Sequence, residues 1–333
     1  MKNTQVKLAA RPLGTPTDAN WNIEINNVEA LSEGQVLIKV EYLSIDPAMR
    51  GWMNEGKSYI RPVKIGEVMR ALGAGVVVDS QHAGFKAGDV VTGGVGVQEY
   101  GILDGKDLIK IDTRFLPMEA YLGTLGMSGM TAYFGLINTG LPKAGETVVV
   151  SGAAGAVGSV VGQIAKIKGC RVVGIAGGED KCKYVLDELG FDACVDYKSG
   201  SLRNQLKDAC PAGIDVYFDN VGGDILDTVL SLINIRARIV ICGAISQYNN
   251  TTAPQGPKNY LSLLVNRARM EGIVVFDNAE NYGSAAKEMA GWIAEGKLNA
   301  NCFVAEGGVR AFNDTLLSLF NGVNTGKLVL KIG

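Results

Sequence analysis

The sequence predicts an α/β protein with two domains, a mostly antiparallel β domain over residues 1–125 and a doubly wound parallel sheet over residues 126–297. Three observations lead to this fold class. Short β-like runs separated by turns fill the first part of the chain, strands and helices alternate in the second, and a further strand lies near the C-terminus. A chain of 333 residues is long enough for about two domains with cores of their own.

The first domain is predicted from four short runs of β-forming residues, at 36–42, 74–78, 89–92 and 97–100. Gly, Pro and Asp separate these runs at spacings of roughly ten residues, which favours a small antiparallel domain. The tail of the chain carries one more run, at 327–331, and this strand can return to the first domain.

The second domain is predicted from six strands with helices between several of them. The strands are expected at 147–151, 171–176, 193–196, 215–219, 238–242 and 271–275, and helices at 156–168, 181–189 and 224–232. Parallel strands joined by crossover helices are typical of a doubly wound sheet.

Composition and charge exclude several classes of function. The 32 basic and 34 acidic residues nearly cancel, so no long-range field favours nucleic acid or an anionic membrane. The N-terminus has no signal-peptide pattern, and no apolar run reaches the ~20 residues that a membrane helix needs. We therefore expect a cytoplasmic protein.

Cysteine and histidine usage argues against metal catalysis. The six cysteines are scattered without a closely spaced pair, and His82 is the only histidine. A catalytic zinc needs three protein ligands and a structural zinc usually four, so we expect no metal site. A Ser-His or Cys-His nucleophile is equally disfavoured, because His82 lies in a turn-like stretch typical of the surface.

A glycine-rich turn between the strand at 147–151 and the helix at 156–168 predicts a nucleotide site. Its glycines, Gly152, Gly155 and Gly158, have the pattern G-x-x-G-x-x-G. Glycines let the backbone approach a pyrophosphate closely, and the helix directs its amide groups toward it. The pattern alone is weak, but its place between a β run and an apolar-periodic helix favours a nucleotide site over simple packing.

The next strand indicates which nucleotide. An NAD site usually ends this strand with Asp or Glu, about 20 residues past the glycines. Here the strand runs into Gly177 and Gly178, and the acids come two residues later, followed by Lys181. Lys181 can pair with a 2′-phosphate, and Tyr197, past the third strand, can flank the adenine or donate to that phosphate. The sequence therefore predicts NADP(H).

Seven segments of the chain resemble one enzyme family. They are GAAGAVG at 152–158, YFDNVGG at 217–223, ICGAISQYN at 241–249, MEG at 270–272, DPAMRG at 46–51, KSY at 57–59 and GMSGMTAY at 126–133. In combination they are similar to the zinc-independent medium-chain dehydrogenase/reductases, in the branch of prostaglandin, alkenal double-bond and curcumin reductases. The similarity extends over essentially the whole chain.

The resemblance implies a fold and an activity. It implies a GroES-like first domain, completed by residues 298–333, and a Rossmann domain that binds NADPH. It implies reduction of the C=C bond of α,β-unsaturated aldehydes and ketones, by a homodimer. One departure is Ala48, where the family commonly has tyrosine, so the acceptor pocket is expected to be wider or differently shaped.

The family pattern also implies the cofactor contacts. These contacts would lie near the nicotinamide half, the pyrophosphate or the adenosine phosphate. The residues implied are Met127, Thr131, Gly155, Ala156, Val157, Gly158, Lys181, Tyr197, Asn220, Cys242, Gly243, Ala244, Ile245, Ser246, Phe276 and Asn324.

Hydride transfer to the β-carbon leaves negative charge on the carbonyl oxygen, which needs a hydrogen-bond donor, and the α-carbon needs a proton. Without a suitable histidine, a tyrosine, a cofactor ribose hydroxyl or water must serve. Tyr248 and Tyr59 are the two catalytic candidates, although tyrosines often simply line clefts. Arg50 is expected to be structural.

Two other functions stay open at this point. A zinc-free NADPH quinone reductase would use the same cofactor site with a different acceptor. A non-catalytic NADPH-binding protein would keep the cofactor site without turnover.

Overall fold

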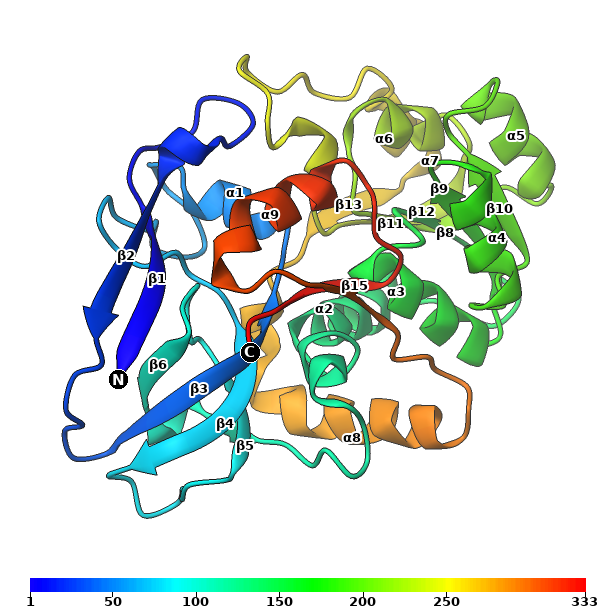
Figure 1. The fold of residues 1–333 in the computed structure, drawn as a ribbon. Coiled ribbons are helices and arrows are strands. Elements are labelled where there is room, and N and C mark those ends of the chain that lie inside the picture. Colours follow the sequence, from blue (N-terminus) through cyan, green and yellow to red (C-terminus); the bar gives the residue numbers. More distant parts are fainter. The chain divides into compact units, whose positions relative to one another are not determined.

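The structure, a computed structural model, describes residues 1–333. They form two compact units, one of Met1–Gly123 with Cys302–Gly333 and one of Thr124–Asn301. In Figure 1 the first unit is coloured blue, cyan and red, and the second runs from green to orange. No helix has the length and apolar character needed to cross a membrane.

The first unit is built around an antiparallel sheet. Its strands and helices are β1 (Lys2–Leu8), β2 (Trp21–Asn27), β3 (Gln35–Ser44), α1 (Ala48–Trp52), β4 (Gly73–Ser80), β5 (Val90–Gly93), β6 (Tyr100–Asp104), β7 (Ile109–Lys110), β14 (Cys302–Ala305), α9 (Phe312–Phe320) and β15 (Lys327–Lys331). The larger sheet has the order β14-β15-β3-β4-β5-β7, with β6 also paired to β3.

The C-terminal strand returns to this sheet, as its sequence indicated. β15 pairs antiparallel with β3, with Val329 opposite Ser44, and β14 adds in parallel beside it. Leu330 and Ile38 are buried in a core that also takes Phe312 of α9. The burial of these apolar side chains is what holds the tail of the chain against its first third.

Two features near the N-terminus differ from the prediction. β1 and β2 form a separate antiparallel pair where no strand was predicted. The strand expected at 97–100 is wrong, because β6 begins only at Tyr100. The backbone before it is bonded to β1 instead, since Val6 N–H donates to Val97 O at 2.9 Å and Glu99 N–H to Thr4 O at 3.1 Å.

The second unit is a six-stranded parallel sheet with the order β10-β9-β8-β11-β12-β13. Its elements are α2 (Met127–Phe134), β8 (Thr147–Ser151), α3 (Ala156–Ile167), β9 (Arg171–Ala176), α4 (Glu179–Asp187), β10 (Ala193–Asp196), α5 (Leu202–Ala209), β11 (Ile214–Asp219), α6 (Gly223–Leu230), β12 (Ile233–Ile241), α7 (Leu261–Asn266), β13 (Arg269–Gly272) and α8 (Tyr282–Ala294). This is the doubly wound arrangement that the sequence predicted.

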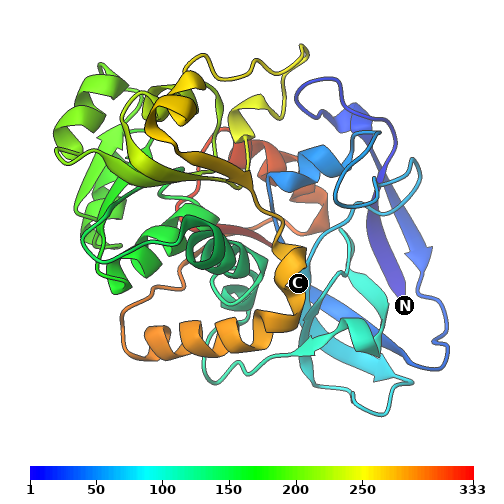
Figure 2. The same cartoon turned by 180° about the vertical axis from the view of Figure 1, so that it is seen from behind.

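Helices cover both faces of this sheet (Figures 1 and 2). Val148 and Val150 of β8 point into one core with α2, α3 and α8, whereas Val149 points into the other with α5 and α6. Alternate residues of a strand face opposite sides. Both faces of β8 are buried, and its centre is a run of three valines between Thr147 and Ser151.

Two predicted strands of this unit need correction. The strand expected at 238–242 is β12, which covers Ile233–Ile241 and so begins earlier. The last strand is also displaced. It was expected at 271–275, but β13 covers Arg269–Gly272 and a 3₁₀ helix, Val275–Asn281, follows. All four residues of β13 are exposed, so it lacks the buried apolar pattern that marks the central strands.

Candidate functional site

The glycine-rich turn lies where the order of the parallel sheet reverses. β8 and β11 are central neighbours, and the chain continues from β8 to β9 on one side and from β11 to β12 on the other. In open α/β sheets, ligands bind beyond the carboxyl ends of the strands at this switch point. Ser151 ends β8 and Asp219 ends β11, so the segments that follow them start at this position.

The backbone of the turn requires glycine. Gly152 has a φ of 60°, in the left-handed region. A Cβ on Gly158 would lie 2.3 Å from the carbonyl oxygen of Gly152, so no larger residue fits there. The first bond into α3 is donated by Ser159 N–H to Gly155 O at 3.0 Å. The backbone N–H groups of the three residues before Ser159 therefore have no acceptor within the helix, and they are suited to bind an anion.

A second group suited to an anion lies at the ends of β9 and β10. A Cβ on Gly177 would lie 2.8 Å from the Tyr197 hydroxyl oxygen, so the aromatic side chain covers this glycine. Lys181 lies in the first turn of α4. Burial lowers the pKa of Lys181, and the charge of Lys198 lowers it further.

Neither of these two lysines has an ion-pair partner. The salt bridges of the protein include neither Lys181 nor Lys198, and Asp196 at the end of β10 accepts from backbone amides. Asp196 Oδ1 accepts from Gly178 N–H at 2.8 Å and from Lys198 N–H at 2.9 Å. Two lysines outside any salt bridge, close enough for the charge of one to lower the pKa of the other, are suited to bind the 2′-phosphate of an adenosine ribose.

Asp219 is the centre of a buried hydrogen-bond network at the switch point. Its Oδ1 accepts from the hydroxyls of Tyr217 at 2.8 Å and Ser151 at 3.0 Å, and from the amides of Val221 at 3.0 Å and Gly222 at 2.9 Å. Its side chain is fully buried, Oδ2 has no partner, and burial raises the pKa of this carboxyl. The network fixes the loop that follows β11.

Asn220 connects the ends of the two central strands. Its amide nitrogen Nδ2 donates to Ser151 O at 2.7 Å, and its backbone N–H donates to Ser151 Oγ at 2.9 Å. Its carbonyl accepts from Ile245 N–H at 3.3 Å. Asn220 therefore joins β8, β11 and the loop after β12, and its side chain serves structure as well as any ligand.

The loop after β12 is bound to the same network. Cys242 and Gly243 donate their amides to Asp219 O at 2.9 and 3.1 Å, and the Ser246 hydroxyl donates to Val221 O at 2.6 Å. Burial raises the pKa of the Cys242 thiol to about 12, and the Asp219 carboxyl adds to this shift. Cys242 is therefore protonated at neutral pH and is a poor nucleophile.

The hydroxyl of Tyr248 lies against its own loop. Ala244 N–H donates to the Tyr248 hydroxyl oxygen at 3.2 Å, and a Cβ on Gly243 would lie 2.8 Å from that oxygen. Glycine at 243 therefore makes room for the hydroxyl. Ala244, which the family pattern places at the cofactor, donates its backbone amide to Tyr248.

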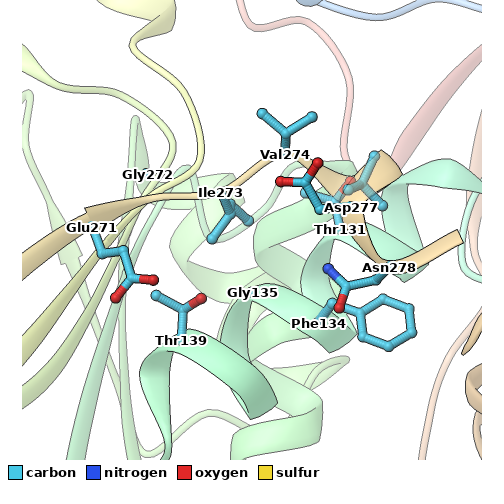
Figure 3. Close-up of a pocket in the computed structure, with 11 residues that line it drawn as sticks. Thr131, Phe134, Gly135, Thr139, Glu271, Gly272, Ile273, Val274, Asp277 and Asn278 are labelled. Atoms are coloured by element: carbon cyan, nitrogen blue, oxygen red, sulfur yellow. The ribbon is translucent and has the colours of Figure 1, made fainter. Parts of the chain in front are cut away.

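Met127 and Thr131 lie on α2 beside the segment after β13. Thr131 Oγ1 donates to Met127 O at 2.8 Å, and the Tyr282 hydroxyl approaches Met127 Sδ at 3.7 Å. Thr131 lines a cavity of about 170 Å³ between α2 and residues 271–278. Figure 3 shows Asp277 beside Thr131 at one end of it and Glu271 near Thr139 at the other. Val275 lines the same cavity, and Phe276, the next residue, is 43% exposed.

Tyr59, Asn324, Arg50 and Ala48 belong to the first unit. Tyr59 is 56% exposed, whereas Asn324 is buried and donates from Nδ2 to Gly326 O at 2.8 Å. Arg50 is structural, as expected: it is buried and donates to Gly14 O at 2.9 Å and Pro12 O at 3.0 Å. Ala48 begins α1.

No three His, Cys, Asp or Glu side chains gather in a way that could hold a metal ion. His82 accepts from Gly84 N–H at Nδ1 and packs against Phe85, with ring centroids 5.4 Å apart. It is a structural residue of a turn.

Two residues of the site were not singled out from the sequence. In the sequence Lys198 resembles an ordinary surface charge next to Tyr197. Its position close behind the end of β10 could nevertheless have indicated a ligand contact. Asp219 is the acid inside YFDNVGG, and its role becomes visible only through its four donors.

Comparison with known proteins shows the family. Residues 4–111 match the N-terminal domain of oxidoreductases, and residues 156–291 match a family described as zinc-binding dehydrogenase. The chain is 46% identical to the Bacillus subtilis protein YfmJ (98% of this chain, 97% of that protein) and 43% identical to the NADPH-dependent curcumin reductase of Escherichia coli (99% and 97%). It is 41% identical to prostaglandin reductase 1 of Mus musculus (96% and 95%).

A solved structure agrees in fold over the whole chain. CurA from Vibrio vulnificus, solved in complex with NADPH, is 43% identical and superimposes with a TM-score of 0.94, covering 99% of each chain. The chain thus belongs to the medium-chain dehydrogenase/reductases, in the zinc-independent branch that includes curcumin reductase and prostaglandin reductase 1.

Proposed function

We propose that this protein reduces the C=C bond of α,β-unsaturated aldehydes and ketones with NADPH, by hydride transfer to the β-carbon. It is an NADP-dependent oxidoreductase, and its relatives over nearly the full chain include a curcumin reductase and a prostaglandin reductase. The observation that carries the proposal is the loop after β12, where Tyr248 offers a positioned hydroxyl at the carboxyl end of the sheet.

The chain's own residues fit NADPH at both ends of the molecule. Lys181, Lys198 and Tyr197 would hold the 2′-phosphate, and the first amides of α3 would hold the pyrophosphate. Thr131 and Phe276 would lie toward the nicotinamide half. When bound, NADPH supplies the hydride.

Tyr248 would donate a hydrogen bond to the substrate's carbonyl oxygen. Its hydroxyl oxygen accepts from Ala244 N–H at 3.2 Å, which fixes the position of the ring. A hydroxyl that accepts a hydrogen bond is a better donor, because bonds in a chain polarise one another. A donor placed where negative charge develops stabilises the transition state more than the ground state. Tyr59 is the alternative donor.

The test is a panel of acceptors with product analysis. We expect NADPH oxidation with a 2-alkenal and an aryl alkenone, and none with the matching saturated aldehyde. With NADPH deuterated at C4, the label should appear on the β-carbon of the saturated product. Faster turnover of a quinone would favour a quinone reductase, and no rate above the enzyme-free control would favour a non-catalytic NADPH-binding protein.

A homodimer is part of this proposal. β13 is an edge strand whose residues are all exposed, and the neighbouring helix α7 exposes Leu264 (74%) and Val265 (68%). An open strand edge beside apolar side chains is a template for pairing with another chain. A two-fold axis beside β13 would continue the sheet into a second copy.

Light scattering tests the dimer. Leu264→Lys with Val265→Lys should reduce the mass to that of one chain. Leu13→Lys, at a leucine 87% exposed in the first unit, should leave the mass unchanged. A wild-type protein of single-chain mass, or a double variant that stays dimeric, would refute this interface.

A further inference from the structure

Two thiols of the second unit lie in direct contact. Cys182 lies on α4 and Cys194 on β10, and their Sγ atoms are 3.0 Å apart. Both cysteines are free, and both are partly exposed to solvent. The two sulfur atoms need to approach by only about 1 Å more to reach the length of an S–S bond. The fold therefore holds this pair close to the geometry of a disulfide.

Other cysteines of the chain have different surroundings. Cys170 and Cys302 direct their thiols to backbone carbonyl oxygens, at 3.3 and 3.4 Å. Cys210 is buried. The contact between two sulfur atoms distinguishes the pair on α4 and β10 from these three residues.

The hydrogen bond between the two thiols gives them different roles. Burial raises the pKa of both thiols. The Cys194 thiol donates to Cys182 Sγ, which lowers the pKa of Cys182 in part and raises that of Cys194 further. Cys182 is therefore the sulfur that attacks an oxidant, and Cys194 is the sulfur that completes the disulfide. The raised pKa values slow the first step, whereas the contact favours the second, which occurs within one molecule.

The pair joins the two elements that carry the proposed 2′-phosphate contacts. Lys181 directly precedes Cys182 in the first turn of α4. Asp196, two residues after Cys194, accepts from Gly178 N–H at 2.8 Å and so connects β10 to the start of α4. A binding site needs its groups within about 0.5 Å of the productive position. Closing the S–S bond changes the separation of α4 and β10 by about 1 Å at the sulfur atoms, which is enough to displace Lys181.

We propose that Cys182 and Cys194 are an oxidation site, at which a reversible disulfide forms and weakens the binding of NADPH. The weakening rests on the proposed contact of Lys181 with the 2′-phosphate, and the oxidant is a peroxide.

The reaction with hydrogen peroxide has two steps. The Cys182 thiolate attacks one peroxide oxygen, the O–O bond breaks, and one water leaves with the thiol proton, so that Cys182 becomes a sulfenic acid. The Cys194 sulfur then attacks the Cys182 sulfur, the S–O bond breaks, and the second water leaves with the Cys194 proton. Two thiols thus lose two electrons to the peroxide, and a dithiol reverses the change by exchange.

Peptide mass spectrometry tests the bond. The protein is treated with hydrogen peroxide, its remaining thiols are alkylated, and it is cut with trypsin without reduction. Trypsin cuts after Lys181, Lys183 and Lys198, so the two cysteines lie on the separate peptides 182–183 and 184–198. We expect these peptides to be linked, with the loss of two hydrogen atoms, and dithiothreitol should separate them. If peroxide yields no linked pair, the proposal is wrong.

Calorimetric titration tests the effect on the cofactor. A charge-assisted contact is worth about 10-fold or more and is displaced here rather than removed, so the Kd for NADPH should rise about 3- to 10-fold on oxidation. The Kd for NADH, which has no 2′-phosphate, should change little. Dithiothreitol should restore NADPH binding, because it reduces a disulfide but not methionine sulfoxide. The titration uses no substrate, so its outcome is independent of the proposed enone reduction.

Cys182→Ser and Cys194→Ser each remove one sulfur and keep the size of the side chain. Both variants should bind NADPH like the reduced wild type and should no longer respond to peroxide. Cys302→Ser, in the first unit, keeps the pair and should respond like the wild type.

Two results would overturn the proposal even if the linked peptides are found. One is an unchanged Kd for NADPH in the oxidised wild type, and the other is a loss of NADPH affinity in a serine variant treated with peroxide. Should one serine variant not fold, the other variant and the comparison of oxidised with reduced wild type still decide.

Discussion

Replacing Lys181 by Met should convert an NADPH-selective enzyme into one that hardly distinguishes NADPH from NADH. Methionine keeps the apolar stem of the side chain and removes only the charge. Because NADH lacks the 2′-phosphate, its KM should stay within about twofold, whereas the KM for NADPH should rise.

The magnitude follows from the surroundings of Lys181. A hydrogen bond to a charged group is worth about 1.5–3 kcal/mol, or about 10- to 150-fold. Burial has already removed part of the water around this ammonium group, so binding of a phosphate costs less new desolvation and the contact is strong. Lys198 remains in the variant and compensates in part, so we expect about 10- to 50-fold.

The assay is the ratio of kcat/KM for NADPH to that for NADH, with one enone at saturation. Lys183→Met is the matched control, because Lys183 is an exposed lysine on the same helix and should leave the ratio unchanged. Equal losses with both cofactors, or an unchanged ratio in Lys181→Met, would refute the assignment of Lys181 to the 2′-phosphate.

The same substitution has a consequence for stability without cofactor. The pKa of Lys181 is lowered in the folded protein, so at neutral pH its charge opposes folding. That cost disappears as the pH rises through the lowered pKa toward the ordinary lysine value. The Tm of cofactor-free Lys181→Met at pH 7 should therefore equal or exceed that of the wild type, and a clear decrease would show that Lys181 contributes to the fold.

Three further predictions concern catalysis, metal and packing. Tyr248→Phe should lower kcat about 5- to 100-fold with NADPH affinity little changed; a change in KM alone would make Tyr248 a wall of the pocket and Tyr59→Phe the next variant. Dialysis against a strong chelator should leave activity intact, and activity lost and restored by zinc would contradict this. Gly162→Ala should cost about 1–3 kcal/mol in urea unfolding, because the new Cβ would lie 1.8 Å from the buried Phe191 ring, whereas Gly291→Ala in open space on α8 should be neutral or stabilising.

The sequence predicts the strands that short apolar runs mark, including the edge strand β10, whereas the central strand β12 begins at Ile233, before its expected start at 238. β8, β9, β10 and β15 have the bounds expected from their apolar runs. The exposed edge strand β13 was misplaced, and the pair of β1 and β2 was missed, because its outer face is polar. A strand that is buried on one side only has a weaker apolar pattern, and its own residues do not determine which strand it pairs with.

The residues of the candidate site also fall into two groups, those that local sequence predicts and those that only the fold identifies. The glycines, Lys181 and Tyr197 were chosen from local spacing, since a turn and a helix start are local structures. Asp219 could not be chosen on that basis, and Lys198 had only its place after β10 as a signal. Their roles depend on the groups that lie beside them, and these are brought together only by the folded chain.

The network around Asp219 explains why the loops at the switch point can carry a precise site. A buried carboxyl with an unpaired oxygen is unfavourable by itself, and four donors on Oδ1 offset part of that cost. Two of the donors are amides of the loop after β11, and the carbonyl of the same residue accepts two amides of the loop after β12. One residue thus fixes both loops, so the position of Tyr248 depends on the rigid sheet more than on the loop that carries it.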